Sequence, residues 1–214
     1  EFSTSGSLLL DAADAIGTSA NRIDTSVGTL AARVTGAATT GDIFLSEADA
    51  LTVGTATGLN GSSNLSGLST ANNNDITLTT TAGSLTITQN VTANGSGNVD
   101  LRAGGAASDV NVNGATVSST SGNLQVIAGR SILTNTATGT TVEFSTSGSL
   151  LLDAADAIGV TANRIDTSVG TLAARVTGAA TTGDIFISEA DALTIGTAAG
   201  LNGSANLSGL STAN

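Results

Sequence analysis

The chemistry available to this sequence is that of carboxylates and hydroxyl groups, because its 214 residues include no His and no Cys. Lys is absent as well, so the six basic residues are all Arg, against 17 Asp and Glu. These absences exclude a Ser–His–Asp triad, a cysteine nucleophile, a Ser–Lys dyad and a His/Cys zinc site. The sequence also lacks a P-loop, a GxGxxG motif and a DxDxDG calcium loop.

Paired carboxylates could still act as acid and base, as they do in glycoside hydrolysis. Clefts of that kind normally need aromatic platforms for the sugar and cationic groups, and this chain has no Trp and no Tyr. We therefore expect no enzymatic activity and interpret the acids as solvated turn residues that keep the surface soluble. The acids considered for this role are Asp11, Asp14, Asp24, Asp42, Glu47, Asp49, Asp75, Asp100 and Asp109.

Two of these acids form a candidate calcium site. Asp42 and Asp75 each follow the Gly or Asn that begins a repeated aliphatic motif, so they are expected at the same position on consecutive coils. Stacked carboxylates repel one another and would accept a hard cation that prefers oxygen ligands. The Arg residues Arg22, Arg33, Arg102 and Arg130 are interpreted as partners of neighbouring acids rather than as ligand-binding groups.

The net charge of −11 argues against nucleic acid and anionic membranes as partners, because phosphate binding needs cationic groups. No window approaches the roughly 20 apolar residues of a membrane-spanning helix. A disordered chain is the other reading of a Gly/Ser-rich composition. However, 40% of the residues are hydrophobic, and they recur in regular pairs that disorder would not require.

The sequence contains one long stretch twice. Residues 143–214 repeat residues 1–72 at an offset of 142, with differences at six positions. We interpret residues 1–142 as one tandem unit and residues 143–214 as the first half of the next, in a single continuous solenoid cut from a longer array. The differences are Thr18/Val160, Ser19/Thr161, Leu45/Ile187, Val53/Ile195, Thr57/Ala199 and Ser63/Ala205.

A shorter repeat lies within each unit: Gly or Asn, a small polar residue, and then two aliphatic residues separated by one position. Its alternation is typical of strands, and its Val, Ile and Thr content fits a pleated surface. Helical turns in LLLDAADAI and SEADAL are the alternative, but their neighbours at the same register cannot be helical. The motif begins at Gly6, Gly28, Gly41, Asn74, Gly97, Gly122 and Gly148, which predicts six coils in each unit.

Each coil carries a second apolar pair after a small-residue turn and a third apolar position before the next coil. Three short strands in roughly 24 residues predict an all-β fold, a three-sided parallel β-helix or β-solenoid of about nine coils. Glycine and Asn are expected at the corners because they adopt positive φ with little strain. The polar segment Gly54–Asn74 is predicted to be a loop or an excursion from one face. The third apolar position is assigned to Ile23, Val91, Val117 and Val142.

Runs such as GDIFLSEADALTVGTA, NDITLTTTAGSLTI and GNLQVIAGRSILTN resemble the repeat regions of giant bacterial surface proteins, the filamentous-haemagglutinin-like, two-partner-secreted adhesins. The resemblance is one of composition and rhythm and covers the whole chain. It implies a right-handed parallel β-helix that is exported as an extended rod. It also implies a role in adhesion, in a biofilm matrix or in cell–cell bridging. The amino-terminal secretion domain of such proteins is absent from this sequence.

Near-identical units without a recognisable cap predict a structural, fibre-forming rod whose partners are further copies of itself. We expect it at the bacterial cell surface or outside the cell. The alternative function is a ligand-binding adhesin that recognises a host or neighbour-cell glycan, or a protein, through Gly54–Asn74 and its copy. No cofactor other than possible calcium at Asp42 and Asp75 is expected.

Overall fold

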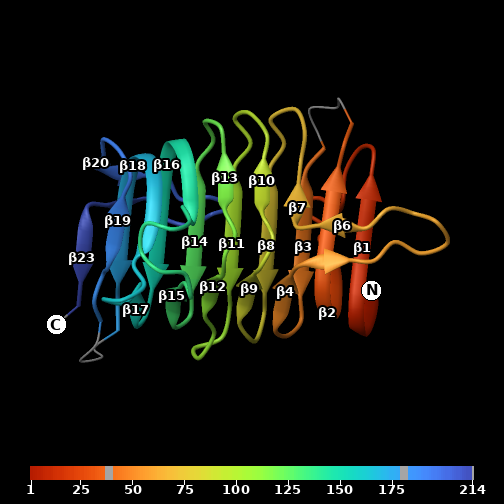
Figure 1. Ribbon diagram of the computed structural model, residues 1–214, viewed down its shortest axis with the longest axis horizontal. Helices are drawn as coiled ribbons and strands as arrows, with labels where there is room; N and C mark the ends of the chain where they lie inside the picture. Colours follow the sequence, from red (N-terminus) through yellow and green to blue (C-terminus); the bar gives the residue numbers. More distant parts are fainter. Residues whose placement is uncertain (37–40, 179–182, 214) are drawn as a thin grey trace.

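Stacked parallel strands form the body of the molecule and follow the alternating aliphatic pattern of the sequence. The computed structural model describes residues 1–36, 41–178 and 183–213, and these residues contain no helix. The strands form a β-solenoid of about eight turns, with successive strands roughly 23 residues apart (Figure 1). The prediction of a parallel β-solenoid is confirmed, with about eight turns in place of nine. The helical alternative for LLLDAADAI is wrong, because most of that segment lies in strand β1 (Phe2–Ala12).

Three stacks of strands run through the middle of the chain. In stack A the strands have five residues, and their first, third and fifth side chains are buried. Stacks B and C have strands of two or three residues, which give the coil its second and third sides. Stack A contains β3 (Ile43–Glu47), β8 (Ile76–Thr80), β11 (Val99–Ala103) and β14 (Leu124–Ala128). Stack B contains β4 (Leu51–Val53), β9 (Leu85–Ile87), β12 (Val110–Val112), β15 (Ser131–Leu133) and β17 (Ala157–Ile158). Stack C contains β7 (Leu68–Ser69), β10 (Val91–Ala93) and β13 (Val117–Ser119).

The aliphatic residues of all three stacks meet in one core inside the coil. Val99, Ile76 and Leu124 lie directly over one another in stack A and are fully buried. Each such side chain contributes roughly 1.5–3 kcal/mol when it is removed from water. The backbone ladder needs almost every N–H group, which explains why the sequence contains no Pro.

The glycines at the start of stack A are required by close approach of neighbouring coils. A Cβ atom at Gly122 would lie 2.1 Å from the carbonyl oxygen of Gly97, and one at Gly148 would lie 2.5 Å from that of Gly122. None of these three glycines has a positive φ angle. The expectation that these corners need a left-handed conformation is therefore wrong, and steric contact with the coil below is the reason for Gly.

The first two coils are simpler than those that follow. In β2 (Ile23–Val34), residues 29–30 pair with β4 and residues 32–33 pair with β7, so stacks B and C converge on one strand. Leu30 therefore does not lie in the same stack as Ile43, whose neighbours are Ile16 and Ile76. The assignment of both residues to the same step of the short repeat is wrong, because the long strand β2 pairs with stacks A, B and C in turn.

The two copies of the repeated stretch occupy different stacks. Residues 8–12 of β1 pair with residues 30–34, which lead into stacks B and C. Their copies, residues 150–154 of β16 (Phe144–Ala154), pair with β14 and extend stack A. The offset of 142 residues is consequently not a whole number of coils, and about six coils in each unit stays a prediction. Each new unit begins on another side of the rod.

Strand β16 also changes one core assignment. Its first residues, Phe144 and Ser145, pair with Val117 and Ser118 and extend stack C. Phe144 is fully buried there, whereas Val142 lies outside the strands and is only partly buried. Val142 was therefore wrongly assigned to the third apolar position, because the turn before β16 is longer than the turns before β10 and β13.

Strands of the second copy complete the same 19-stranded sheet, and two hairpins leave it. Residues 54–67, the first arm, contain an antiparallel pair and rejoin the sheet at β7. Residues 196–209, the second arm, repeat this arrangement. The prediction that Gly54–Asn74 contains an excursion is confirmed for residues 54–67. The arms contain β5 (Thr55–Ala56), β6 (Leu65–Ser66), β21 (Thr197–Ala198) and β22 (Leu207–Ser208). The other strands are β18 (Ile165–Val176), β19 (Ile187–Glu189), β20 (Thr194–Ile195) and β23 (Leu210–Thr212).

Candidate functional surfaces

Asp42 and Asp75 lie on consecutive coils, as their spacing predicts, but their oxygens have backbone partners. The backbone N–H of Asp75 donates to Asp42 Oδ1 at 2.8 Å, and that of Asn98 donates to Asp75 Oδ1 at 2.7 Å. The series continues with the backbone N–H of Asn123, which donates to Asn98 Oδ1 at 2.9 Å. An Asp or Asn side chain at this corner thus links each coil to the next.

This ladder is relevant to the calcium hypothesis. Burial raises the pKa of Asp75 above its ordinary value, and the nearby Asp42 charge raises it further, while hydrogen bonds from Asn98 oppose the change. Asn98 performs the same linking task one coil after Asp75, so the task does not need a negative charge. Among the described residues, no group of three or more His, Cys, Asp and Glu side chains could hold a metal ion. Calcium at Asp42 and Asp75 stays a prediction.

Two glutamates are buried inside the coil walls. Glu47 accepts hydrogen bonds from the Thr25 hydroxyl at 2.6 Å and from the Val27 backbone N–H at 3.0 Å. Glu143 accepts the Asp166 backbone N–H at 2.7 Å and the Thr134 hydroxyl at 2.9 Å. Burial is the main reason why the pKa of each glutamate is raised, and these hydrogen bonds partly offset it. Both carboxylates tie neighbouring coils together.

Asp166, next to Glu143, is also buried. Its Oδ2 accepts the Gly139 backbone N–H, and its Oδ1 has no hydrogen-bond partner in the described part of the chain. A pocket of about 180 Å³ adjoins it, lined by residues 139–142 and by Ser188. The Asp166 charge contributes to the raised pKa of Glu143.

The Arg residues mostly form ion pairs, as expected. Arg102 lies over Asp100 with both Nε and Nη2 within 3.0 Å of the carboxylate oxygens. Arg22 is different, because its Nη1 donates to the Thr79 hydroxyl at 2.9 Å. The described pairs of the four residues considered are Arg33 with Asp11, Arg102 with Asp100, and Arg130 with Asp109.

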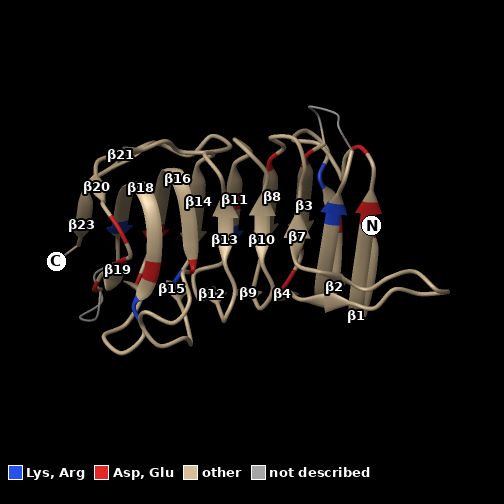
Figure 2. Cartoon of the chain, turned by 45° about the horizontal axis from the view of Figure 1, so that its top comes forward, with Lys and Arg blue, Asp and Glu red and all other residues tan. Residues whose placement is uncertain are grey.

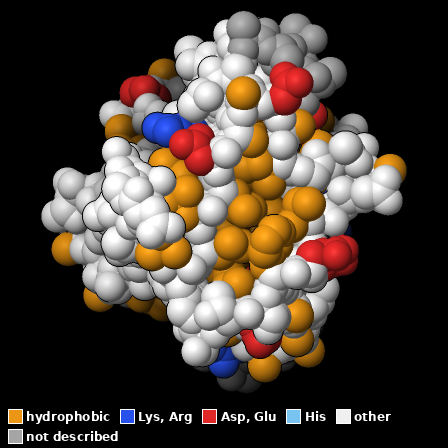
Figure 3. Space-filling view, turned by 90° about the vertical axis from the view of Figure 1, so that its right-hand side faces the viewer, with side chains coloured by type: hydrophobic (Ala, Val, Ile, Leu, Met, Phe, Trp, Pro, Cys, Tyr) orange, Lys and Arg blue, Asp and Glu red, His pale blue; other side chains and the backbone are white. Residues whose placement is uncertain are grey.

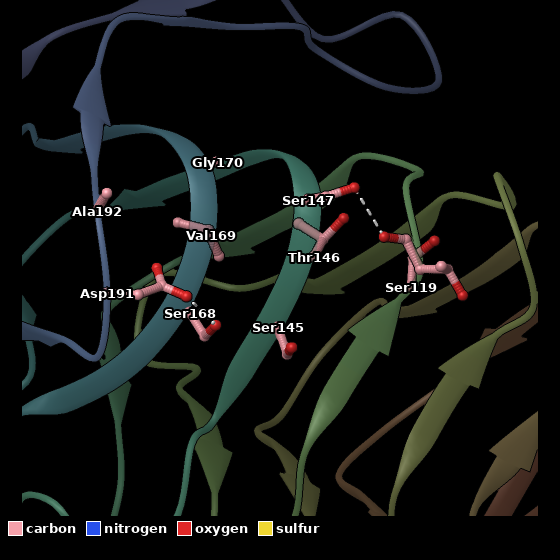
Figure 4. A pocket seen from close by; sticks show the side chains of 10 residues that line it. Ser119, Ser145, Thr146, Ser147, Ser168, Val169, Gly170, Asp191 and Ala192 are labelled. Atoms are coloured by element: carbon pink, nitrogen blue, oxygen red, sulfur yellow. Dashed lines mark hydrogen bonds between the residues drawn. The ribbon is translucent and has the colours of Figure 1, made fainter.

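A groove lined by hydroxyl groups occurs in both copies, where β1 and β16 turn a corner. The groove beside β16 has a volume of about 550 Å³, and its copy beside β1 about 510 Å³. Figure 4 shows Ser145, Ser168 and Asp191 on this groove. The Ser168 hydroxyl donates to Asp191 Oδ2 at 3.2 Å. With no His or Lys in the sequence, these serines can exchange hydrogen bonds but have no general base of that kind.

The second arm lies along the outer surface of stack A. Its base packs Ala198 and Leu207 against Leu151 of β16 and Ala173 of β18. From there the arm runs across β18 and β16 towards β11, at the top of the view in Figure 2. It covers a row of outward-facing residues, so side chains that alternation places outside the coil are nevertheless buried.

The tip of the second arm binds a polar cluster that we call the socket: Thr77, Asp100, Arg102 and Gln125. The Leu201 backbone N–H donates to Gln125 Oε1 at 2.9 Å, and Arg102 Nη2 donates to the Leu201 carbonyl at 2.8 Å. Asn202 Nδ2 donates to Asp100 Oδ2 at 2.7 Å and to Thr77 Oγ1 at 3.1 Å. Gln125 Nε2 also donates to Asp100 Oδ1 at 2.7 Å, so the socket is itself connected.

No protein-family model, curated protein or solved structure matches this chain. The β-solenoid architecture and its internal repeat therefore stand on the sequence and the coordinates alone. The search for membrane spans, confined to the described residues, found no helix long and apolar enough to cross a bilayer.

Sequence reasoning missed the socket. Asp100 was considered only as a solvated turn residue, whereas it is almost fully buried beneath Asn202. The partners are about 100 residues apart, and nothing in the local pattern joins them. One signal was present: Thr77, Asp100 and Gln125 occupy the same outward position of successive stack A strands. A column of polar groups able to bind a strand-like segment could have been proposed from that alignment.

Proposed function

We propose that this chain is part of a structural, fibre-forming rod of an extracellular bacterial surface or matrix protein. The observation that carries the proposal is the continuity of the ladder across the unit boundary. Strands β13 and β14 of the first unit pair directly with β16, the first strand of the second. A chain of such units would form one rod with one core, and its length would be proportional to the number of units.

The open end of the solenoid supports association with further copies. Figure 3 shows hydrophobic side chains gathered in the centre of the end that β1 forms. They include Leu8, Leu10 and Ala12, which are only partly buried at the edge of the core. Within the described part of the chain, strand β1 also pairs on one side alone. An apolar end with an unpaired strand favours stacking of another coil upon it.

The composition and repeat spacing that the sequence shares with filamentous-haemagglutinin-like adhesins support a location of this rod at the cell surface or in a matrix. The functional contribution would then come from length and stiffness, in adhesion, biofilm or cell–cell bridging.

Electron microscopy of chains with one, two and three added 142-residue units tests this proposal. The expected result is unbranched rods whose length increases by a constant step per unit, with a fibre reflection near the inter-strand spacing of about 4.8 Å. Separate globules joined by flexible segments, or particles of constant length, would refute a continuous rod.

A ligand-binding adhesin is the second candidate, because the first arm presents an exposed apolar tip. Leu59 is 76% exposed, the highest value among the large hydrophobic residues of the described chain. Replacing residues 55–66 and 197–208 by short turns separates the two functions. If the arms bind a glycan or protein ligand, cells or beads that display the rod lose attachment while rods still form. Unchanged attachment would exclude the arms as the binding surface.

A further inference from the structure

The two arms have the same internal structure but different surroundings. Each arm has a hydroxyl contact of 2.7 Å at its base, Thr55 with Ser66 and Thr197 with Ser208. Towards the tip, a glycine N–H donates to an Asn side chain at 3.0 Å in both arms. The arm is therefore shaped by its own sequence, and docking does not create that shape.

The bases of the arms also dock in the same way. The first arm passes over β2 and then β1, as the second passes over β18 and then β16. These strands correspond one to one in the repeated stretch. Beyond β16, the second arm continues onto β14, β11 and β8, where the socket lies. Beyond β1, the first arm extends free of the rod, to the right of the N-terminal end in Figure 1.

The tips that differ in surroundings are identical in sequence. Residues 58–62 and 200–204 both read GLNGS, and the two arms differ only at Thr57/Ala199 and Ser63/Ala205. Asn60 and Asn202 also share a left-handed backbone, with φ angles of 53° and 48°. The first arm thus presents Leu59 and Asn60 in the form that binds the socket, and among the described residues neither makes a hydrogen bond outside the arm.

We propose that the first arm binds the socket of a second copy of the repeat unit. Its Leu59 backbone would pair with Gln125 and Arg102 of that copy, and its Asn60 side chain with Asp100 and Thr77. The position of the socket within the unit determines which segment an arm can reach. Residues 73–142 carry the socket and come directly before Glu143, so an arm docks on the segment that precedes its own unit. A copy of residues 1–142 stacked on β1 would bring its socket to the first arm.

Such an arm acts as a clasp across the junction between units. The coil interface alone relies on strand pairing and on the apolar core, which are similar at every step. The arm adds a contact that spans several coils and occurs once per unit. It therefore favours stacking of whole units in one register. This inference rests on the proposed rod, and it names the partner as a second copy of the same unit.

Amide hydrogen exchange tests this clasp through the exchange rate of one backbone N–H group in each arm. In the chain of 214 residues, the Leu201 N–H should exchange slowly because it donates to Gln125, whereas the Leu59 N–H should exchange freely. The Gln125→Ala variant calibrates the assay: exchange at Leu201 should become faster while Leu59 stays unchanged. Since the sequence has no Cys, spin-label or dye pairs can be introduced as a second readout without background.

The decisive chain carries one additional unit, residues 1–142, fused ahead of Glu1. The expected result is that exchange at the original Leu59 slows about tenfold, the factor that corresponds to a hydrogen bond of about 1.4 kcal/mol. Gln125→Ala in the added unit alone should restore fast exchange at Leu59 and leave Leu201 protected. Protection that survives this substitution would overturn the assignment of the socket.

The fused chain also separates the clasp from the rod. A longer rod in which Leu59 still exchanges freely would overturn the clasp and leave the proposed function intact. Slow exchange at Leu59 in a chain that forms only separate short particles would support the clasp and contradict the fibre. A dye pair at Leu59 and at Gln125 of the added unit distinguishes direct docking, with high energy transfer, from protection by unrelated contacts.

Discussion

Residues 1–72 and 143–214 are nearly the same sequence in two environments, and the contrast separates what a coil specifies by itself from what its neighbours supply. Phe2 is 44% exposed, whereas its copy Phe144 is fully buried. The difference runs the other way at the far end, where Leu68 is buried and its copy Leu210 is about half exposed. Each copy is covered only on the side where another coil continues the stack.

The comparison shows that the sequence of a strand determines its pairing register in this fold. The burial of the strand depends instead on the coils next to it. The pairing of β1 with β2 and that of β16 with β18 have the same register, including the irregularity at the corner. Yet β16 pairs with β13 and β14 and extends stacks A and C, whereas the described partner of β1 is β2. Identical strands can therefore serve on any side of the coil, because each side offers the same ladder and the same aliphatic layer.

The largest expected difference between the copies concerns their first Phe. Phe144→Ala would leave a cavity in a closed part of the core and should lower the free energy of unfolding by about 3–5 kcal/mol. Phe2→Ala, the matched control, should cost less than about 1 kcal/mol because Phe2 is half exposed. Urea denaturation followed by circular dichroism measures both. Equal losses would show that the N-terminal end is covered in solution, as stacked copies would cover it.

The socket should rank second. Asp100→Ala removes the partner of Arg102, Gln125 and Asn202 together, and should cost about 2–3 kcal/mol because hydrogen bonds to a buried charge are lost. Asp11→Ala breaks the exposed ion pair with Arg33 and should cost at most about 1 kcal/mol. Chemical denaturation of the two variants compares them. A loss at Asp100 no larger than at Asp11 would mean that the second arm is not docked.

The buried glutamates give a pH dependence with a definite sign. Because burial raises the pKa values of Glu47 and Glu143 above their ordinary value of 4.5, the folded state binds protons more tightly than the unfolded state. Their contribution to stability is fully present below pH 4.5 and is lost as the pH rises through the folded pKa values. We therefore expect the melting temperature to fall from pH 5 to pH 7.

The copies supply the control for this pH dependence. Glu143→Gln should flatten the dependence, whereas Glu1→Gln should leave it unchanged, because Glu1 is exposed at the end of the rod. Thermal unfolding in a pH series reports the difference. A melting temperature that rises between pH 5 and pH 7 in the unsubstituted chain would contradict the burial of these carboxyls.

The series of Asp and Asn side chains that links each coil to the next predicts a smaller effect on stability. Asp75→Asn keeps the acceptor for the Asn98 N–H and removes a desolvated charge, so it should stabilise the chain by up to about 1 kcal/mol at pH 7. Asp184→Asn, at the exposed copy of Asp42, should change stability by less than about 0.5 kcal/mol. Calcium at Asp42 and Asp75 requires the opposite: a melting temperature that rises with calcium, and a loss of that rise in Asp75→Asn.

Much of this fold could be predicted from the sequence because its information is local. The alternating aliphatic pairs at Leu85 and Ile87, or at Val110 and Val112, specify strands, and the small-residue turns before them specify the corners. The excursion at residues 54–67 was also visible, as a polar interruption of the repeat. Its boundary with β7 was not, because Leu68 resembles the Leu residues of the arm and differs only in pairing.

Features that depend on the stacking of coils could not be read from the pattern. The two copies occupy different stacks because the unit contains a fractional number of coils. The sequence of a single coil does not show this fraction. The position of Asp42 beside Asp75 was predicted correctly from register. The burial of Asp100 was not predicted, because Asn202, which covers it, belongs to an arm about 100 residues later in the sequence. That arm reaches Asp100 by running along the axis of the rod.

The finest test of the comparison uses the two arm tips. Asn202→Ala should lower the free energy of unfolding by about 1 kcal/mol more than Asn60→Ala does, because only Asn202 donates to Asp100 and Thr77. Both Asn residues have positive φ angles, so the backbone cost of placing Ala there is similar in the two variants and cancels in the difference.

That cancellation makes the pair sensitive to docking alone. In the chain fused behind an added unit, Asn60 would gain the same partners, and the difference between the two substitutions should disappear. Parallel denaturation curves of both variants in both chains complete the cycle. If Asn60→Ala stays milder in the fused chain, the first arm does not reach the added socket. Rod and clasp would then be independent properties of the repeat.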